Sequence, residues 1–206
     1  MEEKTKIKLC GMMNPPDVIT AAELQVDYVG FILSEGFRRT IPLGTFCELD
    51  SYLHDHSNTV KKVGVFVNEP IENIMEYYEE MLDVIQLHGK EDDTYIRNLR
   101  KYTDKPIIKA FKIVSAEDIQ LAVNSTADYV LLDSGTGTGK TFDHSLIRGI
   151  ERPYFLAGGL TADNVAEAID SLHPYAVDAS SCLETDGKKD RNKMIEFVNA
   201  IRSENT

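Results

Sequence analysis

The chain has 206 residues, of which 42% are hydrophobic, and its formal net charge at pH 7 is −12. This length suits one domain with a sizeable core, and we interpret residues 1–206 as a single domain. The acidic balance argues against a general nucleic-acid binder, which normally presents a basic face. An anionic small molecule is not excluded, because backbone amides also hold phosphate inside acidic proteins.

The sequence also bears on cellular location. No run approaches the roughly 18 apolar residues of a membrane span, and the first residues contain no apolar segment typical of a secretory signal. The three cysteines match neither a zinc motif nor a disulfide framework in their spacing. We therefore expect a cytoplasmic protein with no metal site and no membrane partner.

Short β-like runs recur along the chain, and most of them are continuously apolar rather than alternating. Continuous apolar character is typical of parallel strands that are covered on both faces. The eight predicted strands are Lys6–Cys10, Tyr28–Leu33, Lys62–Val67, Val84–His88, Ile107–Phe111, Tyr129–Asp133, Tyr154–Ala157 and Ala176–Ala179.

Helix-like stretches with start signals lie between these runs. Asn14 and the prolines after it offer a cap and a first turn, and Ser115 with Asp118 resembles a capping box. The predicted helices are Val18–Leu24, Ile71–Met81 after a cap at Asn68, Ile119–Val123, Val165–Leu172 and Lys193–Ile201. Repeated strand–helix alternation predicts an α/β fold, a (β/α)8 TIM barrel with short loops.

Two reactive side chains stand at the ends of predicted strands. Cys10 ends the first strand and Asp133 ends the sixth, and the chemistry of a barrel lies at the C-terminal ends of its strands. A thiol and a carboxylate there suggest an acid–base pair. Each also has an ordinary explanation, as a small buried hydrophobe and as a helix cap or turn residue. We expect Cys47, inside a helical stretch, to be such a buried hydrophobe.

The loops after the last two predicted strands hold a stronger signal. Gly158 and Gly159 lie between a strand and a helix start, and Ser180 and Ser181 follow the next strand, close to Asp178. Barrels commonly build a phosphate site from these two loops, where glycines let the backbone approach and helix N-termini direct N–H donors. A tight turn would explain the glycine pair alone, but both loops in this order favour phosphate.

Three further features bear on a ligand site. Arg39 follows the second strand and is suited to a carboxylate, although a solvated arginine explains it equally well. His88 ends the fourth strand, where it either lines the site or bonds to the nearby backbone. The glycine-rich segment 135–141 lacks the glycine spacing of a Walker loop, and we interpret it as a flexible loop over the site that carries Lys140.

Eight short motifs occur in one order along the chain. They are Lys8–Met12, Val29–Leu33 with Arg39, Val63–Asn68, Gln86–Gly89, Leu131–Asp133, Gly137–Asp143, Leu156–Leu160 with Asn164, and Val177–Ser181 with Glu184. Each motif alone is weakly specific, whereas eight in one order are highly specific. Together they resemble the phosphoribosylanthranilate isomerase family of tryptophan biosynthesis, and the resemblance covers essentially the whole chain.

The resemblance implies a cofactor-free Amadori rearrangement of a phosphosugar, N-(5'-phosphoribosyl)anthranilate. The sequence does not fix the oligomeric state and leaves both a monomer and a homodimer open. The product is 1-(o-carboxyphenylamino)-1-deoxyribulose 5-phosphate. Carried over by position, Cys10 is the general base and Asp133 the general acid, while Arg39 binds the anthranilate carboxylate. His88 and Asp178 are expected to contact the substrate, and the two loops described above are expected to hold its phosphate.

The chain departs from the family pattern at three places. Cys182 stands where the family usually has glycine, and we expect it to crowd the phosphate loop or to change its backbone angles. His144 replaces a frequent tryptophan, which we expect to alter packing only. Around Arg39 the local sequence differs, so that Arg38 remains a second candidate for the carboxylate.

Two other functions stay open on the residues alone. One is a different phosphosugar enzyme on the same barrel, such as a histidine-pathway isomerase or a pentose-phosphate epimerase. The former enzymes use paired aspartates and the latter a metal site, whereas this chain offers a cysteine and an aspartate. The other is a non-catalytic protein that binds a phosphorylated ligand, which Cys182 favours slightly and the intact Cys10 and Asp133 disfavour.

Overall fold

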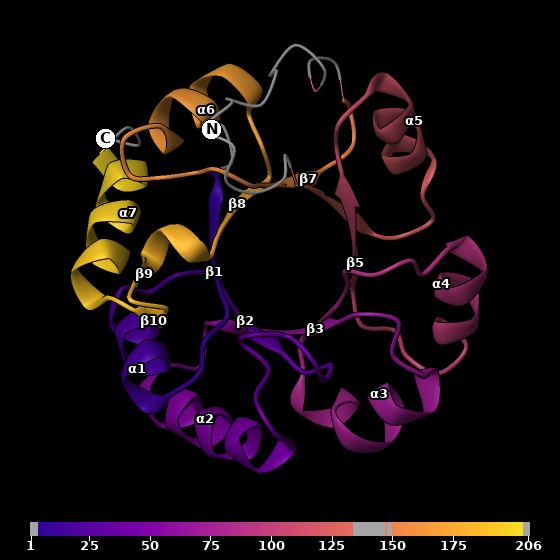
Figure 1. Ribbon diagram of the computed structural model, residues 1–206, viewed down its shortest axis with the longest axis horizontal. Helices are drawn as coiled ribbons and strands as arrows, with labels where there is room; N and C mark the ends of the chain where they lie inside the picture. Colours follow the sequence, from indigo (N-terminus) through magenta and orange to yellow (C-terminus); the bar gives the residue numbers. More distant parts are fainter. Residues whose placement is uncertain (1–3, 134–146, 148–149, 204–206) are drawn as a thin grey trace.

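The strands close into a parallel barrel in the computed structural model, which describes residues 4–133, 147 and 150–203 (Figure 1). Each strand pairs with the next one in the chain, and the last pairs with the first. The predicted TIM barrel is therefore confirmed. The barrel strands are β1 (Lys6–Cys10), β2 (Tyr28–Ile32), β3 (Lys61–Phe66), β4 (Val84–Leu87), β5 (Ile107–Lys112), β6 (Tyr129–Asp133), β7 (Tyr154–Ala157) and β8 (Ala176–Ala179).

The described helices form a ring around the barrel (Figure 1). They are α1 (Pro15–Glu23), α2 (Leu43–His56), α3 (Ile71–Tyr77), α4 (Asp93–Leu99), α5 (Ala116–Asn124), α6 (Val165–Leu172) and α7 (Arg191–Ser203). A short antiparallel pair, β9 (Glu184–Thr185) and β10 (Lys188–Lys189), follows β8. Segment 135–141 and His144 lie outside the described residues. None of the helices that the structure describes combines the length and apolar character needed to cross a bilayer.

Local sequence explains the starts of three helices, α1, α4 and α5. Asn14 caps α1 as predicted, and Asp17 completes a capping box there that was not predicted. Ser115 and Asp118 form the predicted capping box at the start of α5. The start of α4 has a signal that the sequence analysis did not use, because the Asp92 side chain accepts a hydrogen bond from the backbone of α4.

Two local predictions are wrong. Asn68 does not cap α3, since it has a positive φ of 52° and its side chain accepts from the Lys90 N–H instead. Pro70 occupies the N-cap position of α3. Cys47 is exposed on α2 rather than buried, because its side chain lies on the outer face of that helix.

Alternate strand residues face two different cores. On β1, Ile7 and Leu9 pack in the large cluster between the barrel and its helices. Lys8 and Cys10, one position out of phase, turn to the barrel interior, because side chains alternate across a strand. At the N-terminal end of the barrel, aromatic rings such as Tyr28 and Phe155, with centroids 5.5 Å apart, fill this interior. Polar side chains replace them toward the other end, where the candidate site lies.

Candidate active site

One pocket, of about 720 Å³, opens at the C-terminal ends of the barrel strands. Because all strands run parallel, this end gathers residues that are far apart in the sequence. Every residue that the sequence analysis proposed for a site lines this pocket. They are Cys10, Arg39, His88, Asp133, Gly158, Gly159, Asp178, Ser180 and Ser181.

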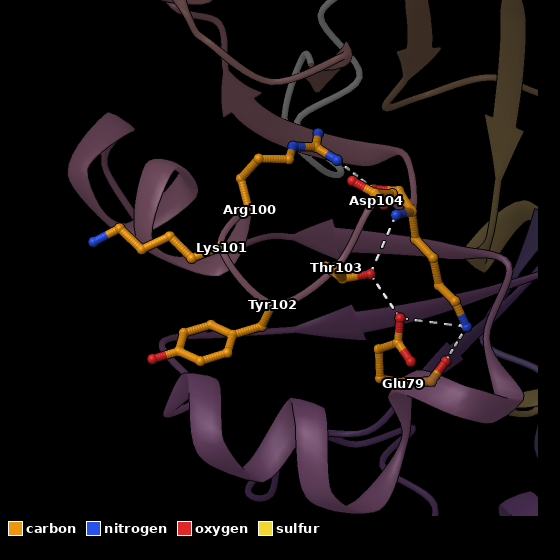
Figure 2. Close-up of a pocket in the computed structure, with 7 residues that line it drawn as sticks. Glu79, Arg100, Lys101, Tyr102, Thr103 and Asp104 are labelled. Carbon is orange, nitrogen blue, oxygen red and sulfur yellow. Dashed lines mark hydrogen bonds and ion pairs between the residues drawn. The ribbon is translucent and has the colours of Figure 1, made fainter.

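A second hollow, of about 580 Å³, lies beside the N-terminal end of β5 and is lined by Glu79 and residues 100–105 (Figure 2). Its polar groups bond to one another. Thr103 donates to the Glu79 carboxylate at 2.6 Å, and Lys105 donates to the carbonyl oxygens of Glu79 and Leu82. It contains none of the proposed site residues, so the C-terminal pocket is the candidate active site.

Cys10 reaches this pocket from the end of β1 and is 7% exposed. Gly30, its partner on β2, makes room for the thiol, because a Cβ atom at Gly30 would lie 2.6 Å from the Cys10 sulfur. The Ser180 hydroxyl donates to the Cys10 carbonyl oxygen at 2.8 Å and ties the end of β1 to the loop after β8. The thiol is therefore fixed at the mouth of the barrel.

Asp133, at the end of β6, faces His88, which follows β4. The distance from His88 Nε2 to Asp133 Oδ2 is 3.8 Å, too long for a direct hydrogen bond. The Gln86 amide nitrogen lies 2.9 Å from His88 Nδ1. An amide nitrogen only donates, so Nδ1 accepts and the neutral ring carries its hydrogen on Nε2, toward Asp133.

The charge of His88 follows from its surroundings. Burial is the largest influence on the pKa of His88 and lowers it, and the charge of Asp133 opposes burial without reversing the shift. The positive charges of Lys8 and Lys109 lower the pKa further. His88 is thus a neutral imidazole at pH 7, suited to donate a hydrogen bond rather than to hold a positive charge.

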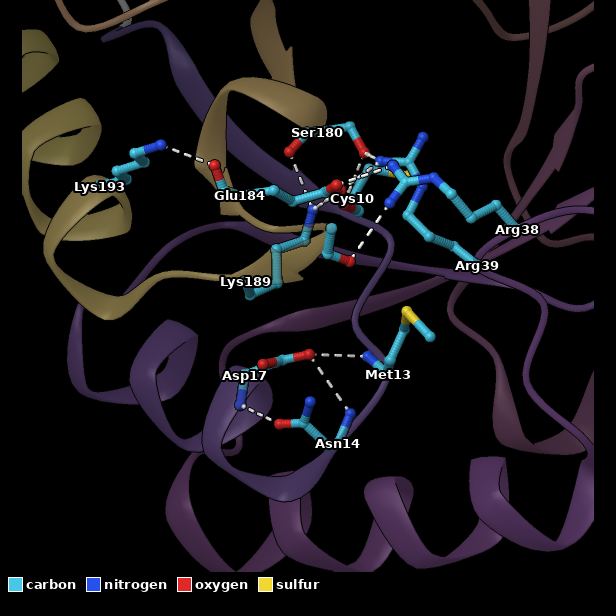
Figure 3. A network of polar contacts seen from close by, with 11 residues as sticks. Cys10, Met13, Asn14, Asp17, Arg38, Arg39, Ser180, Glu184, Lys189 and Lys193 are labelled. Carbon is cyan, nitrogen blue, oxygen red and sulfur yellow. Dashed lines mark hydrogen bonds and ion pairs between the residues drawn. The ribbon is translucent and has the colours of Figure 1, made fainter.

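Arg39 belongs to a polar network at the rim (Figure 3). Its Nη1 donates to Glu184 Oε1 at 2.9 Å and to the Ser180 hydroxyl oxygen. The side chain lies across Gly11, where a Cβ atom would come within 2.8 Å of Arg39 Cδ. Gly11 has a φ of 82°, which favours glycine. Two independent features therefore require glycine beside the arginine.

Glu184 is the centre of that network. Arg38 Nη2 donates to Glu184 Oε2 at 2.7 Å, and Lys189 Nζ lies 3.2 Å from Oε1 (Figure 3). Burial alone would raise the pKa of Glu184, but the hydrogen bonds and charges of Arg38, Lys189 and Arg39 hold it below its ordinary value. An ionised Glu184 thus fixes three cations around one side of the pocket, which favours anionic ligands in an otherwise acidic protein.

A buried ion pair lies among the polar side chains of the barrel interior. Lys8 Nζ is 2.9 Å from Asp178 Oδ2, and the Lys8 side chain is 0% exposed. The other oxygen, Asp178 Oδ1, is buried without a hydrogen-bond partner among the described residues, and so is Gln86 Oε1. Asp178 and Gln86 both line the pocket. Two unpaired buried acceptors are suited to hydroxyl or N–H donors of a ligand.

The loops after β7 and β8 present backbone groups to the pocket. Gly158 and Gly159 have φ values of 86° and 64°, which L side chains rarely adopt. Asn164 holds this loop, since its amide donates to the Gly159 carbonyl at 3.0 Å and its side-chain oxygen accepts from the Thr161 N–H at 2.8 Å. Such a glycine pair before a helix is suited to phosphate.

Comparisons with known proteins agree with this site. A family model described as N-(5'phosphoribosyl)anthranilate (PRA) isomerase matches residues 7–200. The chain belongs to this isomerase family. The N-(5'-phosphoribosyl)anthranilate isomerase of Endomicrobium trichonymphae is 42% identical over 204 residues, covering 96% of this chain and 98% of the relative.

Solved members of the isomerase family share the fold. The crystal structure of phosphoribosyl anthranilate isomerase from Thermotoga maritima has a TM-score of 0.88 and 34% identity, covering 97% of this chain and 99% of that one. A family structure in complex with reduced 1-(o-carboxyphenylamino)-1-deoxyribulose 5-phosphate has a TM-score of 0.85 and 33% identity, with the same coverage. Membership of this family excludes the alternatives of a histidine-pathway isomerase and a pentose-phosphate epimerase.

Cys182, a departure from the isomerase family pattern, lies in the short 3-10 helix Ser181–Leu183 after β8. Its backbone is not in the left-handed region. Its side chain packs partly against the core between barrel and helices, and burial raises the pKa of its thiol. Cys182 therefore acts as a small apolar side chain at the edge of the pocket.

Lys189 was not predicted as a site residue, and Lys8, Gln86 and Glu184 were named only as parts of motifs. For two of them a signal exists. Lys8 and Gln86 are polar residues at interior positions of barrel strands, two residues before Cys10 and His88. The network of Lys189 and Glu184 depends on the β9–β10 turn, which no periodicity predicts.

Proposed function

We propose that this chain converts N-(5'-phosphoribosyl)anthranilate to 1-(o-carboxyphenylamino)-1-deoxyribulose 5-phosphate without a cofactor, the third step of tryptophan synthesis from chorismate. The observation that supports the residue roles is that Cys10 and Asp133 line one pocket with Arg39 and the glycine pair. The substrate carries two anionic groups, a carboxylate and a phosphate. Its rearrangement requires a base, an acid and a binding site for each of these groups.

Asp133 is the proposed general acid. It protonates the ring oxygen of the furanose, and the C1–O bond breaks with its electron pair going to that oxygen. The anthranilate nitrogen then shares its lone pair with C1 and forms a protonated Schiff base. An unperturbed aspartic acid has a pKa of about 3.9 and is mostly ionised at neutral pH, so the acid role requires a desolvated site that favours the protonated form. The neutral Nε2–H of His88, on the Asp133 side, is suited to orient this carboxyl group.

Cys10 is the proposed general base. As a thiolate it removes the proton from C2 of the open-chain Schiff base, and the C2–H electrons form the C1–C2 double bond of an enolamine. Tautomerisation of the enolamine to the ketone completes the reaction. The thiol must be ionised before this step, and an unperturbed thiol with a pKa of about 8.5 is only a few per cent ionised at pH 7.

The two anionic ends of the substrate are anchored away from the reacting carbons. Arg39 binds the anthranilate carboxylate, with a planar guanidinium that matches a carboxylate fork. The two loops that carry Gly158, Gly159, Ser180 and Ser181 hold the phosphate with backbone N–H groups and the Ser181 hydroxyl, while the unpaired Asp178 Oδ1 accepts from a sugar hydroxyl. Binding energy at both ends positions C1 and C2 between the base and the acid.

The test is turnover of freshly prepared substrate, followed by the loss of anthranilate fluorescence. Cys10→Ser and Asp133→Asn should each lower kcat by about 100-fold or more, as the removal of a general acid or base does. Cys47→Ser, which changes an exposed cysteine on α2, is the matched control and should keep kcat. Full kcat in either Cys10→Ser or Asp133→Asn would refute the assigned roles.

Assembly, location and domain organisation are also proposals. We infer one domain over residues 1–206 that functions as a monomer or a homodimer in the cytoplasm. All three cysteines are free, which fits a reducing compartment. A phosphoribosylanthranilate isomerase of Thermotoga maritima is described as dimeric. Light scattering of the purified chain would decide between the two states by its mass.

A further inference from the structure

An exposed aromatic side chain lines the candidate active site. Phe37 lies in the loop between β2 and α2, two residues before Arg39, and is 46% exposed. Single exposed apolar side chains are common on protein surfaces. Among the exposed large apolar side chains that the structure describes, however, Phe37 is the one that lines the C-terminal pocket. Its ring is therefore available to a ligand in that pocket.

The loop holds the backbone of Phe37 in a fixed place. The Thr40 N–H donates to the Phe37 carbonyl at 3.0 Å, and the Phe37 N–H donates to the Thr40 hydroxyl oxygen at 3.2 Å. The Thr40 hydroxyl in turn donates to the Ser34 carbonyl at 2.7 Å. The Ser34 hydroxyl accepts from the Val67 N–H at 2.9 Å and ties the loop to the end of β3. The exposure of the ring is therefore a property of an anchored loop.

Apolar side chains of β2 and β3 line the pocket on the same side of the barrel. Ile32 ends β2 and pairs with Val65 on β3. Ile32 is in phase with Tyr28, and Val65 with Val63, and both of these partners pack in the barrel interior. The side chains of Ile32 and Val65 therefore turn inward as well. Val67 follows in the same phase, and all three line the pocket.

The proposed substrate joins its carboxylate directly to a benzene ring. If Arg39 binds that carboxylate, the ring must lie beside the guanidinium, next to the loop that carries Phe37. Ligand sites combine a mostly apolar lining with a few polar groups that fix orientation, and the apolar side chains of β2, β3 and Phe37 supply such a lining beside Arg39. Aromatic rings also attract each other in offset-stacked or edge-to-face arrangements.

We propose that Phe37 packs against the aryl ring of the substrate and makes the site selective for phosphosugars that carry an aromatic amine. This inference rests on the proposed function, because it takes Arg39 to bind the anthranilate carboxylate. Phe37 belongs to the stretch around Arg39 where the chain departs from the family pattern, so the contact is assigned to this chain and not to the family.

Calorimetric binding of two probes tests this inference without turnover. Reduced 1-(o-carboxyphenylamino)-1-deoxyribulose 5-phosphate carries the aryl ring, whereas ribulose 5-phosphate lacks it. In Phe37→Ala, the Kd of the ring-bearing probe should rise about three- to tenfold, the range for the loss of one aromatic contact. The Kd of ribulose 5-phosphate should stay unchanged. Tyr102→Ala is the matched control, because Tyr102 is 66% exposed but lies in the second hollow (Figure 2), and it should change neither Kd.

A fluorescence measurement covers the case in which Phe37→Ala does not fold. The chain contains no tryptophan, so Phe37→Trp keeps an aromatic side chain and introduces a single tryptophan. Its emission is quenched by energy transfer to the anthranilate group of the ring-bearing probe, and this transfer falls steeply with distance. Quenching should be strong in Phe37→Trp and much weaker in Tyr102→Trp, which places the tryptophan beside the N-terminal end of β5.

The outcomes separate this inference from the proposed function. Weaker binding of the ring-bearing probe alone in Phe37→Ala, with strong quenching in Phe37→Trp, supports the contact. An unchanged Kd, an equal loss for both probes, or equal quenching in the two tryptophan variants overturns it, even if the unmodified chain turns over substrate. If the contact is found but the unmodified chain has no turnover, the proposed function fails and the role of Phe37 in binding stands.

Discussion

Arg39 Nη1 lies 2.9 Å from Glu184 Oε1, and this contact holds the guanidinium at the rim of the pocket. The Nε and Nη2 groups of Arg39 have no hydrogen-bond partner in the part of the chain that the structure describes. Arg38 differs, because both of its terminal nitrogens are engaged, one with Glu184 and one with the Gly187 carbonyl. The geometry therefore favours Arg39 as the carboxylate ligand.

Exchange of each arginine for lysine tests this choice. Arg39→Lys keeps the charge but loses the planar fork, so KM should rise about tenfold or more. Arg38→Lys, the matched control, should change KM by less than about threefold, because an exposed ion pair contributes little. Steady-state kinetics on both variants measure the difference. A larger KM effect from Arg38→Lys would make Arg38 the carboxylate ligand.

Much of this site could be predicted from the sequence, because its residues lie at the ends of predicted strands. Cys10, Asp133 and Asp178 lie in apolar runs whose parallel arrangement was predictable, and a closed barrel brings all strand ends to one rim. The choice between Arg38 and Arg39 was not predictable, because both follow β2 in a loop without periodicity. The two arginines are distinguished only by the turn between β9 and β10. This turn places Glu184 and the Gly187 carbonyl near Arg38.

The barrel interior shows a second limit of sequence reasoning. The alternation on β1 predicts that Lys8 shares a face with Cys10, but it does not identify a counter-ion. Asp178 becomes that counter-ion only through the register between β1 and β8, a contact between residues 170 positions apart. Local patterns contain no information on such a register, so buried polar pairs in a barrel are found only once the strands are placed.

Gly11→Ala should damage both stability and substrate binding. Its φ of 82° costs an L residue about 1–2 kcal/mol, and the new Cβ would lie 2.8 Å from Arg39 Cδ. Gly36→Ala is the control, because Gly36 has a φ of 88° but no atom within 4 Å of the added Cβ. Urea unfolding should show a similar loss for both, whereas only Gly11→Ala should raise KM. Equal KM values would mean that Gly11 does not position Arg39.

His88 should make the protein less stable at mildly acidic pH. Burial lowers the pKa of His88 in the folded chain below its ordinary value of 6.5. The unfolded chain therefore takes up a proton near pH 6.5 that the folded chain does not, and stability rises with pH wherever the unfolded state binds more protons. The stability contribution of a neutral His88 is complete above about pH 6.5 and is lost as pH falls toward the lowered pKa.

Urea unfolding at pH 7.5 and pH 5.5 measures this contribution. The unmodified chain should lose more unfolding free energy between the two conditions than His88→Gln, which keeps a polar side chain but cannot titrate. His54→Gln, on the exposed surface of α2, is the control and should match the unmodified chain. If His88→Gln loses as much stability as the unmodified chain does, His88 is not held neutral by the fold.

Ser180 and Ser181 should have different roles, and only the Ser181 hydroxyl should bind the phosphate. The Ser180 hydroxyl donates its single hydrogen to the Cys10 carbonyl and accepts from Arg39, so that hydrogen is not available to a phosphate. The Ser181 hydroxyl is exposed and has no hydrogen-bond partner among the described residues. Ser181→Ala should therefore weaken phosphate binding by about three- to tenfold, the range for one hydrogen bond.

Competitive inhibition by inorganic phosphate measures this difference, because phosphate occupies the phosphate subsite without a carboxylate or a sugar. Its inhibition constant should rise in Ser181→Ala and stay unchanged in Ser180→Ala. Ser180→Ala should instead raise KM, since Arg39 loses one of the two groups that position it. A higher phosphate inhibition constant in Ser180→Ala than in Ser181→Ala would show that the Ser180 hydroxyl leaves the Cys10 carbonyl when the phosphate binds.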